Sequence, residues 1–366
     1  QRSGVRIGMM DVTASAPGKL VLLGDYAVLE GAPALVMGVN RHARVRISAK
    51  AGGVAEVSAP DMNVSQVPLR IGADGLPEWL GPPEQVEKLR LVDQTLRGLH
   101  AEGLAPPPGR GFSLHLDTSE FFDQGADGRS KLGLGSSAAL TVALASAMAV
   151  FVGRGAATAN RRVWLEHLLH LHREFQGGHG SGVDVAAGLI GGVISYRLLE
   201  GGTQPRFEPV HWPAGVHARF VWTGRSASTS DFLSRLAAWR KGHGAEYASH
   251  MQALTGIAQA ACDAATQSRA AAFIESATAY GAALQAFGSA CGLEIFSPEH
   301  VQLGRLAAEM GVSYKPCGAG GGDFGVVFAL EPERLAQVEQ RIAAAGFRCV
   351  PLAVDEQGLH LEYTGF

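Results

Sequence analysis

The chain has 366 residues and a formal net charge of −3; hydrophobic residues make up 46% of it and charged residues 18%. This hydrophobic share excludes a disordered chain, and the length suggests roughly two domains at about 150 residues each. The slight acidic balance and the lack of any long run of Lys and Arg argue against a nucleic-acid-binding protein.

In the first half of the chain, strand-like segments alternate with helical ones. Apolar runs and period-two alternation predict strands over 19–24, 34–38, 43–48, 112–116 and 193–196, with short strands and loops over 51–83. Helical spacing of apolar residues predicts helices over 86–99, 138–152 and 160–175. The apolar stretch 138–152 has about 15 residues, fewer than the ~20 of a membrane-spanning helix. We therefore expect a buried core helix and no membrane association.

The second half opens near Gly201 and is also mixed. The pattern predicts strands over 218–222, 324–330, 347–354 and 359–363, an Ala-rich helical run over 226–292 and a helix over 332–345. We therefore expect an α+β protein with an N-terminal domain over residues 9–200 and a C-terminal domain over residues 201–366. Residues 1–8, ahead of Met9, are expected to be a remnant of expression.

The four cysteines show no pattern that indicates a metal site or a disulfide scaffold. They form no Cys-x-x-Cys pair and have no zinc spacing with His; they are Cys262, Cys291, Cys317 and Cys349. Free cysteines at this chain length favour a reduced compartment, so we expect a cytoplasmic protein.

The strongest chemical signal is Gly133-Leu-Gly-Ser-Ser-Ala138, directly before the apolar helix. Glycines let a backbone approach a bulky anion, and a helix N-terminus with Ser136 or Ser137 as its N-cap favours negative charge. The segment therefore predicts a phosphate cradle, in which Lys131 could neutralise a phosphoryl group. The alternative is an ordinary glycine turn with a serine N-cap.

A second glycine cluster, Gly318-Ala-Gly-Gly-Gly-Asp323, is predicted between a helix and a strand. A cluster of glycines indicates that the backbone closely approaches another group, such as a ligand or another part of the chain. Taken alone, the cluster could also be a bulge or a tight corner.

The segment Gly180-Ser-Gly-Val-Asp-Val185 places a carboxylate among small residues. Asp184 could then stand close to a substrate as a base or a charge positioner. Local sequence alone favours the alternative, in which Asp184 caps the next helix.

The segment Ser15-Ala-Pro-Gly-Lys19 enters a predicted strand. Lys19 could reach a carboxylate or a phosphate there. In isolation, an exposed lysine at the end of a strand is the favoured interpretation.

The thirteen histidines show no metal-ligand spacing, and a packed or solvated helix face is favoured for His167, His170 and His172.

Together and in this order, the motifs resemble those of the GHMP small-molecule kinase superfamily, which includes galactokinases and homoserine, mevalonate and phosphomevalonate kinases. The first family motif is similar to Ser15–Gly31, the second to Gly133–Ala139 and the third to Lys315–Gly325. Three motifs in order are more specific than any one of them, and the resemblance covers essentially the whole chain.

Within the superfamily, the chain is most similar to the phosphomevalonate kinase branch. The similarity is carried by Lys131, by the acidic segment Gln176–Ala187 and by the extra Gly and Asp of Gly318–Asp323. Two positions depart from the pattern: Phe324 stands where that branch often has Cys, and Asp25 replaces a common Glu. These departures leave the exact acceptor open but not the kinase chemistry.

The resemblance implies a two-domain fold with a ribosomal-S5-like N-terminal half and a ferredoxin-like C-terminal half. It implies ATP and Mg²⁺ as cofactors, a small-molecule acceptor, and a monomer or homodimer. The implied ATP-binding residues are Lys131, Gly133, Leu134, Gly135, Ser136, Ser137 and Ala138. The implied acceptor-binding residues are Lys19, Ser181, Gly182, Asp184, Gly320, Gly321 and Gly322, of which Lys19 and Asp184 are catalytic. The implied metal ligands are Ser137 and Glu174.

Physical chemistry separates two kinds of acceptor. If the acceptor is 5-phosphomevalonate, its phosphate nucleophile has a pKa near ~6 and needs no strong base. Charge neutralisation by Lys19, Lys131 and Mg²⁺ would then dominate. If the acceptor is a hydroxyl, as in mevalonate or a sugar, Asp184 would matter more as the base.

Two further rivals are weaker. An ATP-dependent decarboxylase of the mevalonate branch would need a Lys-Trp signature that is missing around Ala16–Gly24. A non-catalytic ligand sensor on the same fold is disfavoured because Lys19, Asp184 and both glycine loops are intact.

Overall fold

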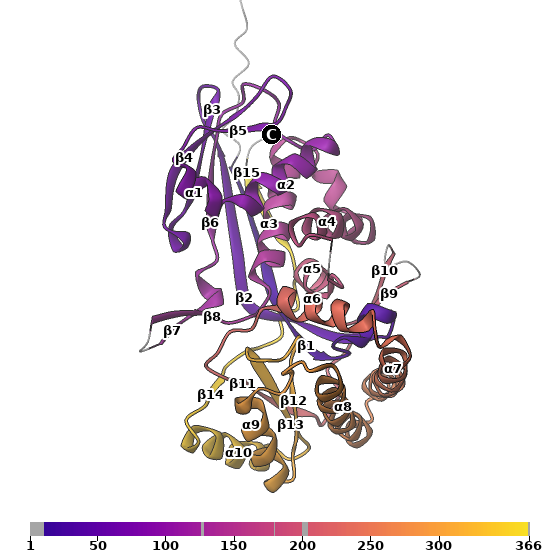
Figure 1. Ribbon diagram of the computed structural model, residues 1–366. Coiled ribbons are helices and arrows are strands. Elements are labelled where there is room, and N and C mark those ends of the chain that lie inside the picture. Colours follow the sequence, from indigo (N-terminus) through magenta and orange to yellow (C-terminus); the bar gives the residue numbers. More distant parts are fainter. Residues whose placement is uncertain (1–10, 126–127, 179, 200–203, 365–366) are drawn as a thin grey trace, which may run out of the picture.

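The computed structural model describes residues 11–364 apart from 126–127, 179 and 200–203. The expected expression remnant and the expected domain boundary at residues 200–201 therefore lie outside the described residues. Two sheets organise the molecule, a large one in the upper part of Figure 1 and a small one in the lower part.

Alternating burial along two long strands explains the large sheet. In β1 (Asp11–Leu23) the side chains of Val12, Ala14 and Ala16 are buried, and β1 pairs antiparallel with β2 (Ala34–Ala49). Within the described residues the sheet has nine strands in the order β10-β9-β2-β6-β3-β4-β5, with β1 against β2 and β15 against β1. The other strands are β3 (Val54–Ala59), β4 (Val64–Ile71), β5 (Pro77–Trp79), β6 (Phe112–Asp117), β9 (Val193–Leu198), β10 (Pro205–Val210) and β15 (His360–Thr364).

Helices cover one face of the large sheet (Figure 1). The Ala-rich helix α3 (Ser136–Phe151) lies against β1 and β2, and it is buried along almost its whole length, as its apolar sequence predicts. The neighbouring helices are α1 (Pro83–Lys88), α2 (Arg90–Ala101), α4 (Arg161–Phe175) and α5 (Val183–Ile190). The helix predicted over 86–99 is divided at Leu89 into α1 and α2.

The small sheet has the antiparallel order β12-β13-β11-β14, with its own apolar cluster around Val221, Tyr314 and Val327. Its strands are β11 (His217–Trp222), β12 (Ser313–Pro316), β13 (Phe324–Ala329) and β14 (Arg348–Val350). The accompanying helices are α6 (Thr229–Arg240), α7 (Gly244–Thr266), α8 (Ala270–Cys291), α9 (Pro298–Glu309) and α10 (Pro332–Ala344).

The chain crosses between the two sheets more than once. The strands β10 and β15 both follow residue 200 in sequence, yet they pair with β9 and β1 of the large sheet. The short elements are a hairpin of β7 (Phe122–Gly125) and β8 (Gly128–Lys131), and the 3-10 helices η1 (Ala27–Glu30), η2 (Pro60–Met62), η3 (Ser119–Phe121) and η4 (Gly155–Thr158). The α+β prediction is confirmed, and the bounds of the two domains stay a prediction.

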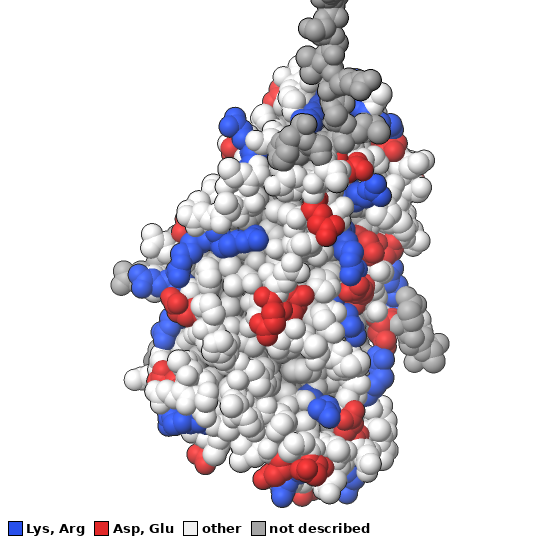
Figure 2. Space-filling model, turned by 180° about the vertical axis from the view of Figure 1, so that it is seen from behind, with Lys and Arg blue, Asp and Glu red and all other residues white. Residues whose placement is uncertain are grey.

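The surface and the helices bear on the expected partners. On the face seen in Figure 2, Lys and Arg side chains are interspersed with Asp and Glu over a largely uncharged surface. Among the helices of the described residues, none combines the length and the apolar character needed to cross a membrane.

Candidate active site

A cleft of about 660 Å³ opens where the two halves of the molecule meet. One wall, the N-terminal wall, comes from β1, the segment before α3 and the start of α5. The other, the C-terminal wall, comes from the start of α6 and the loop between β12 and β13. The starts of α5 and α6 both line it, and Figure 1 shows these helices at the level where the two halves meet.

Lys19 reaches the cleft through an irregularity in β1. The register between β1 and β2 shifts between Pro17 and Gly18, and a side chain at Gly18 would overlap the carbonyl oxygen of Leu134. This close approach lets the backbone N–H of Lys19 donate to that oxygen at 2.8 Å. The Nζ of Lys19 lies 3.4 Å from the carbonyl oxygen of Gly133, so the first and second sequence motifs are in direct contact.

The loop before α3 turns on two glycines in the left-handed region, Gly133 with φ 71° and Gly135 with φ 76°. Gly135 is the N-cap of α3, so the prediction that a serine caps this helix is wrong: Ser136 and Ser137 lie in its first turn. Glycine brings no side chain over the helix end. The first-turn N–H groups and the positive end of the helix therefore remain available to an anion.

The other predicted nucleotide-binding residues divide by burial. Lys131, Gly133, Gly135, Ser136 and Ser137 line the cleft. The side chains of Leu134 and Ala138 are buried in the core, so these two residues present only their backbone to the loop.

Ser137 has a partner that the sequence interpretation missed. Its hydroxyl lies 3.2 Å from Nε2 of His172 on α4. His172 is 1% exposed, and burial lowers the pKa of its imidazole although the carboxylate of Asp184 opposes the shift. A neutral imidazole can accept a hydrogen bond from the hydroxyl of Ser137. The lone pairs of the Ser137 oxygen then remain available to a ligand in the cleft.

The start of α5 brings Ser181, Gly182 and Asp184 to the cleft, as predicted. Gly182 is the N-cap with φ 80°, and a side chain there would overlap Leu169. The hydroxyl of Tyr196 donates to the carbonyl of Ser181 at 2.7 Å and fixes the turn. Asp184 accepts a hydrogen bond from the N–H of Val185 at 2.9 Å, so it lies in the first turn of α5 and also faces the cleft.

A third helix points its N-terminus at the cleft from the C-terminal wall. Ser228 caps α6 by accepting a hydrogen bond from the N–H of Asp231. The hydroxyl-bearing residues of the segment Ser226–Ser230 line the cleft, and Ser226 donates to the carbonyl of Lys131 across it. The starts of α3, α5 and α6 thus meet in one cavity, which favours bound anions.

The third motif lies between the strands β12 and β13, not between a helix and a strand as predicted. Asp25 holds its start: one carboxylate oxygen accepts the N–H of Gly318 at 2.5 Å and the other lies 2.7 Å from Nζ of Lys315. The hydroxyl of Tyr26 donates to the carbonyl of Ala319 at 2.5 Å. Gly318 and Ala319 therefore line the cleft.

Gly320, Gly321 and Gly322, which the resemblance implied to bind the acceptor, are not among the residues that line the cleft. Side chains at these positions would overlap Ile295, the ring of Phe232 and the carbonyl of Arg225, respectively. The three glycines allow the loop to pack against the C-terminal half, facing away from the cleft.

The last residue of the motif, Asp323, does face the cleft, although the sequence interpretation gave it no role. Burial raises its pKa to about 6, against the opposing effects of the Ala227 N–H, Lys19 and Lys131. The pKa of Lys131 is lowered, chiefly by desolvation among the surrounding groups; Lys19 adds to the shift and Asp323 opposes it. The ammonium groups of Lys19 and Lys131 therefore lie close enough to the carboxylate of Asp323 to interact with it in the cleft.

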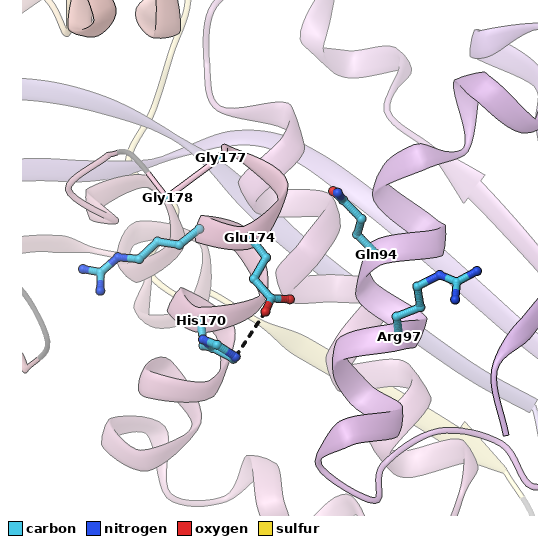
Figure 3. Close-up of a pocket in the computed structure, with 7 residues that line it drawn as sticks. Gln94, Arg97, His170, Glu174, Gly177 and Gly178 are labelled. Atoms are coloured by element: carbon cyan, nitrogen blue, oxygen red, sulfur yellow. Dashed lines mark ion pairs between the residues drawn. The ribbon is translucent and has the colours of Figure 1, made fainter. Parts of the chain in front are cut away.

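Glu174 is not brought to the predicted metal position. Figure 3 shows it in a separate hollow between α2 and α4, where its carboxylate lies 3.5 Å from His170. Residues two apart point to nearly opposite sides of a helix. Because His172 faces Ser137, Glu174 must face outward.

The residues present fit a magnesium ion bound mainly by a nucleotide. Among the described residues, no group of three or more His, Cys, Asp or Glu could enclose a metal ion. Mg²⁺ in phosphoryl-transfer sites typically keeps several waters and substrate phosphates, with only one or two protein ligands. The Ser137 hydroxyl, 3.2 Å from Nε2 of His172, would be available as one such ligand.

Comparisons with known proteins agree with this geometry. Residues 94–192 match the family model described as the GHMP kinases N terminal domain. The chain is 29% identical to a phosphomevalonate kinase of Streptomyces sp. (strain CL190) over 382 aligned residues, which cover 96% of this chain and 99% of that protein. It is 27% identical to a mevalonate kinase of Thermococcus gammatolerans over 359 residues, with the same coverage.

A solved structure shares the fold. Streptococcus pneumoniae phosphomevalonate kinase, in complex with phosphomevalonate and AMPPNP, has a TM-score of 0.71 at 18% identity, covering 94% of this chain and 99% of that chain. The resemblance drawn from the sequence motifs is confirmed at the level of the GHMP kinases. Phosphomevalonate and mevalonate kinases both occur among the similar proteins.

Proposed function

We propose that this chain, which is similar to the GHMP kinases, is a kinase that uses ATP to phosphorylate 5-phosphomevalonate, forming 5-diphosphomevalonate for isoprenoid precursor synthesis. One observation supports this acceptor. The cleft offers two anion-binding helix ends from opposite walls, at α3 and at α6, with the ammonium groups of Lys19 and Lys131 lining the same cavity. Two phosphate-bearing ligands would occupy such a pair of sites, one at each helix end.

The residues divide the work accordingly. The first turn of α3 binds the triphosphate of ATP, and the segment Ser226–Ser230 binds the phosphate of the acceptor. Mg²⁺, when bound with ATP, neutralises phosphate charge and is held on the protein side by Ser137. Lys19 and Lys131 reduce the repulsion between the two anions. Asp184 orients the acceptor or Lys19, because an ionised phosphate oxygen needs no strong base.

A hydroxyl acceptor is the second candidate, and the mevalonate kinase relatives favour it. In that case Asp184 removes the hydroxyl proton, and the start of α6 binds the acceptor carboxylate. The nucleotide site would be unchanged.

Formation of ADP from Mg-ATP in a coupled assay tests the proposal, with 5-phosphomevalonate, mevalonate and galactose run in parallel. We expect turnover with 5-phosphomevalonate and none above background with the other two. Turnover with mevalonate alone would replace the proposed acceptor by the hydroxyl one. Ser137→Ala should lower turnover and raise the Mg²⁺ requirement, whereas Ser289→Ala, an exposed serine on α8 outside the cleft, serves as the matched control.

A further inference from the structure

Asp323 is held in place by its own backbone. It has a left-handed conformation with φ 54°. Its N–H donates to the carbonyl of Arg225 at 2.7 Å, and its carbonyl accepts from the N–H of Thr223 at 3.0 Å. Its carboxylate accepts the N–H of Ala227 at 3.1 Å. The side chain is therefore fixed at the cleft and has little freedom to turn away.

The carboxylate of Asp323 packs on the phosphate loop. A side chain at Gly133 would overlap this carboxylate group. The glycine predicted to let the backbone approach an anion therefore does so, and the anion it approaches is the carboxylate of Asp323. The charged groups that act on it are Lys19 of β1 and Lys131 of β8. The pKa of Cys317 in its own loop is raised chiefly by burial, and Asp323 adds to this shift.

This placement sets up a competition. A phosphate chain bound at the start of α3 would lie beside Gly133 and interact with Lys19 and Lys131, the same two groups that stabilise the ionised carboxylate. Phosphate and carboxylate would also repel each other at close range. Either the carboxylate must be neutralised or nucleotide binding must be weakened.

The cheaper route is protonation, because burial already raises the pKa of Asp323 to about 6. Further negative charge nearby raises the pKa of a carboxyl group more. A protonated Asp323 can still accept the Ala227 N–H through one oxygen, so its position need not change.

We propose that Asp323 takes up one proton from solvent when the phosphate chain of a nucleotide enters the cleft, so that nucleotide affinity is linked to pH through this residue. The inference rests on the nucleotide site of the proposed function and adds to it a proton-linked residue. It makes Asp323 a positioning residue for Lys19 and Lys131 before the nucleotide binds and a neutral neighbour of the phosphates afterwards.

Calorimetric titration with ADP, in EDTA, tests this without relying on turnover. The apparent enthalpy is measured at pH 7.5 in two buffers of different ionisation enthalpy, which gives the number of protons taken up. ADP itself titrates near this pH, so the unchanged chain is compared with Asp323→Asn and Asp323→Gly. Both substitutions suit a positive φ. Asp74→Asn, at an exposed Asp that accepts the Leu76 N–H in a turn, is the matched control.

We expect the unchanged chain and Asp74→Asn to take up close to one proton more than either Asp323 variant. The affinity of the unchanged chain for ADP, relative to Asp323→Asn, should fall by up to about tenfold per pH unit between pH 6.5 and 8. Equal proton uptake in all four proteins, with ADP bound, would overturn the inference alone. A difference that needs Mg²⁺ would make Asp323 a metal ligand and also overturn it. Failure of every protein to bind ADP would overturn the proposed nucleotide site as well.

Discussion

The two walls of the cleft are built in different ways. The N-terminal wall presents its functional groups from regular elements: Lys19 from β1, Ser137 from α3 and Asp184 from α5. The C-terminal wall presents them mainly from two loops: the residues that lead into the start of α6, and Gly318, Ala319 and Asp323 of the loop between β12 and β13. These loops are held by hydrogen bonds to distant residues, such as the bond from the Gly318 N–H to Asp25.

The difference suggests a division of labour. Phosphoryl transfer needs donors and charges at fixed positions, and strands and helix ends provide them. Acceptor choice differs among related kinases, and loops can change without rebuilding a core. Under the proposed function, the N-terminal wall would serve phosphoryl transfer, and the C-terminal wall would influence which molecule receives the phosphoryl group.

The largest expected effect comes from breaking the buried ion pair that holds the start of the loop between β12 and β13. Asp25 and Lys315 form an ion pair in which both side chains are 0% exposed. Asp25→Asn leaves the ammonium of Lys315 buried without its counter-charge, so we expect the free energy of unfolding to fall by about 3–5 kcal/mol in urea titrations. Asp231→Asn, which weakens an exposed pair with Arg235 at 4.0 Å, should change it by less than about 1 kcal/mol. An equally small change in the free energy of unfolding for Asp25→Asn would mean that this ion pair contributes little to stability.

The next prediction concerns the chemical roles of Lys131 and Asp184 on the N-terminal wall. If the acceptor is a phosphate, Lys131→Met should lower kcat/KM by about 100- to 1000-fold, because one charge that offsets the repulsion of two anions is lost. Asp184→Asn should cost less, since no strong base is needed. Lys50→Met, at an exposed lysine that pairs with Glu56, should leave kcat/KM unchanged. The reverse order of Asp184 and Lys131 would favour a hydroxyl acceptor.

The N-terminal wall was also the more predictable of the two. Strands, helices and the loop before α3 follow from local periodicity and from glycine spacing, so Lys19, Ser136 and Asp184 could be placed from short motifs. His172 was missed, although a signal existed. It continues the apolar stripe of Leu165, Leu168 and Leu169 at helical spacing, which predicts an inward-facing side chain.

The C-terminal wall could not be predicted in the same way. Glycines at 320–322 were correctly recognised as sites of close approach, but their neighbours Ile295, Phe232 and Arg225 are distant in sequence. No local pattern shows which side of a loop faces a cleft. The role of Asp323 likewise depends on its contact with Gly133, which only the folded chain brings about.

The third prediction tests whether the loop glycines serve packing. Gly321 has φ 75°, and an added Cβ would meet the ring of Phe232. Gly109 has the same φ, but no described atom lies within 4 Å of its added Cβ. Both Ala substitutions incur backbone strain of roughly 1 kcal/mol. Gly321→Ala should lose about 2 kcal/mol more than Gly109→Ala in the free energy of unfolding because of the overlap. Equal losses in the free energy of unfolding for the two variants would mean that Gly321 faces the cleft and does not pack against Phe232.

The smallest expected effect concerns the carboxylate between the two walls. The pKa of Asp323 is raised in the folded protein to about 6, above its ordinary value of 3.8, so the folded state binds this proton more tightly than the unfolded state. The contribution of Asp323 to stability therefore falls as the pH rises from about 4 to 6, and the full penalty is present above pH 6. Asp323→Asn cannot ionise. We expect it to raise the free energy of unfolding by about 1–2 kcal/mol at pH 8 and to have little effect at pH 4.

Urea unfolding at pH 4, 5, 6 and 8 measures this difference between the two proteins. His300, whose pKa burial lowers to about 4, shifts stability in the opposite direction over the same range. It is present in both proteins, so its effect cancels in the comparison, and Asp74→Asn should show no such pH-dependent gain. A variant less stable than the unchanged chain at pH 8 would mean that Lys19 and Lys131 gain more from the carboxylate than its burial costs. If Asp323→Asn instead raises the free energy of unfolding only at high pH, the ionised Asp323 is a group that lowers stability. It lies in the cleft, where the N-terminal and C-terminal walls meet.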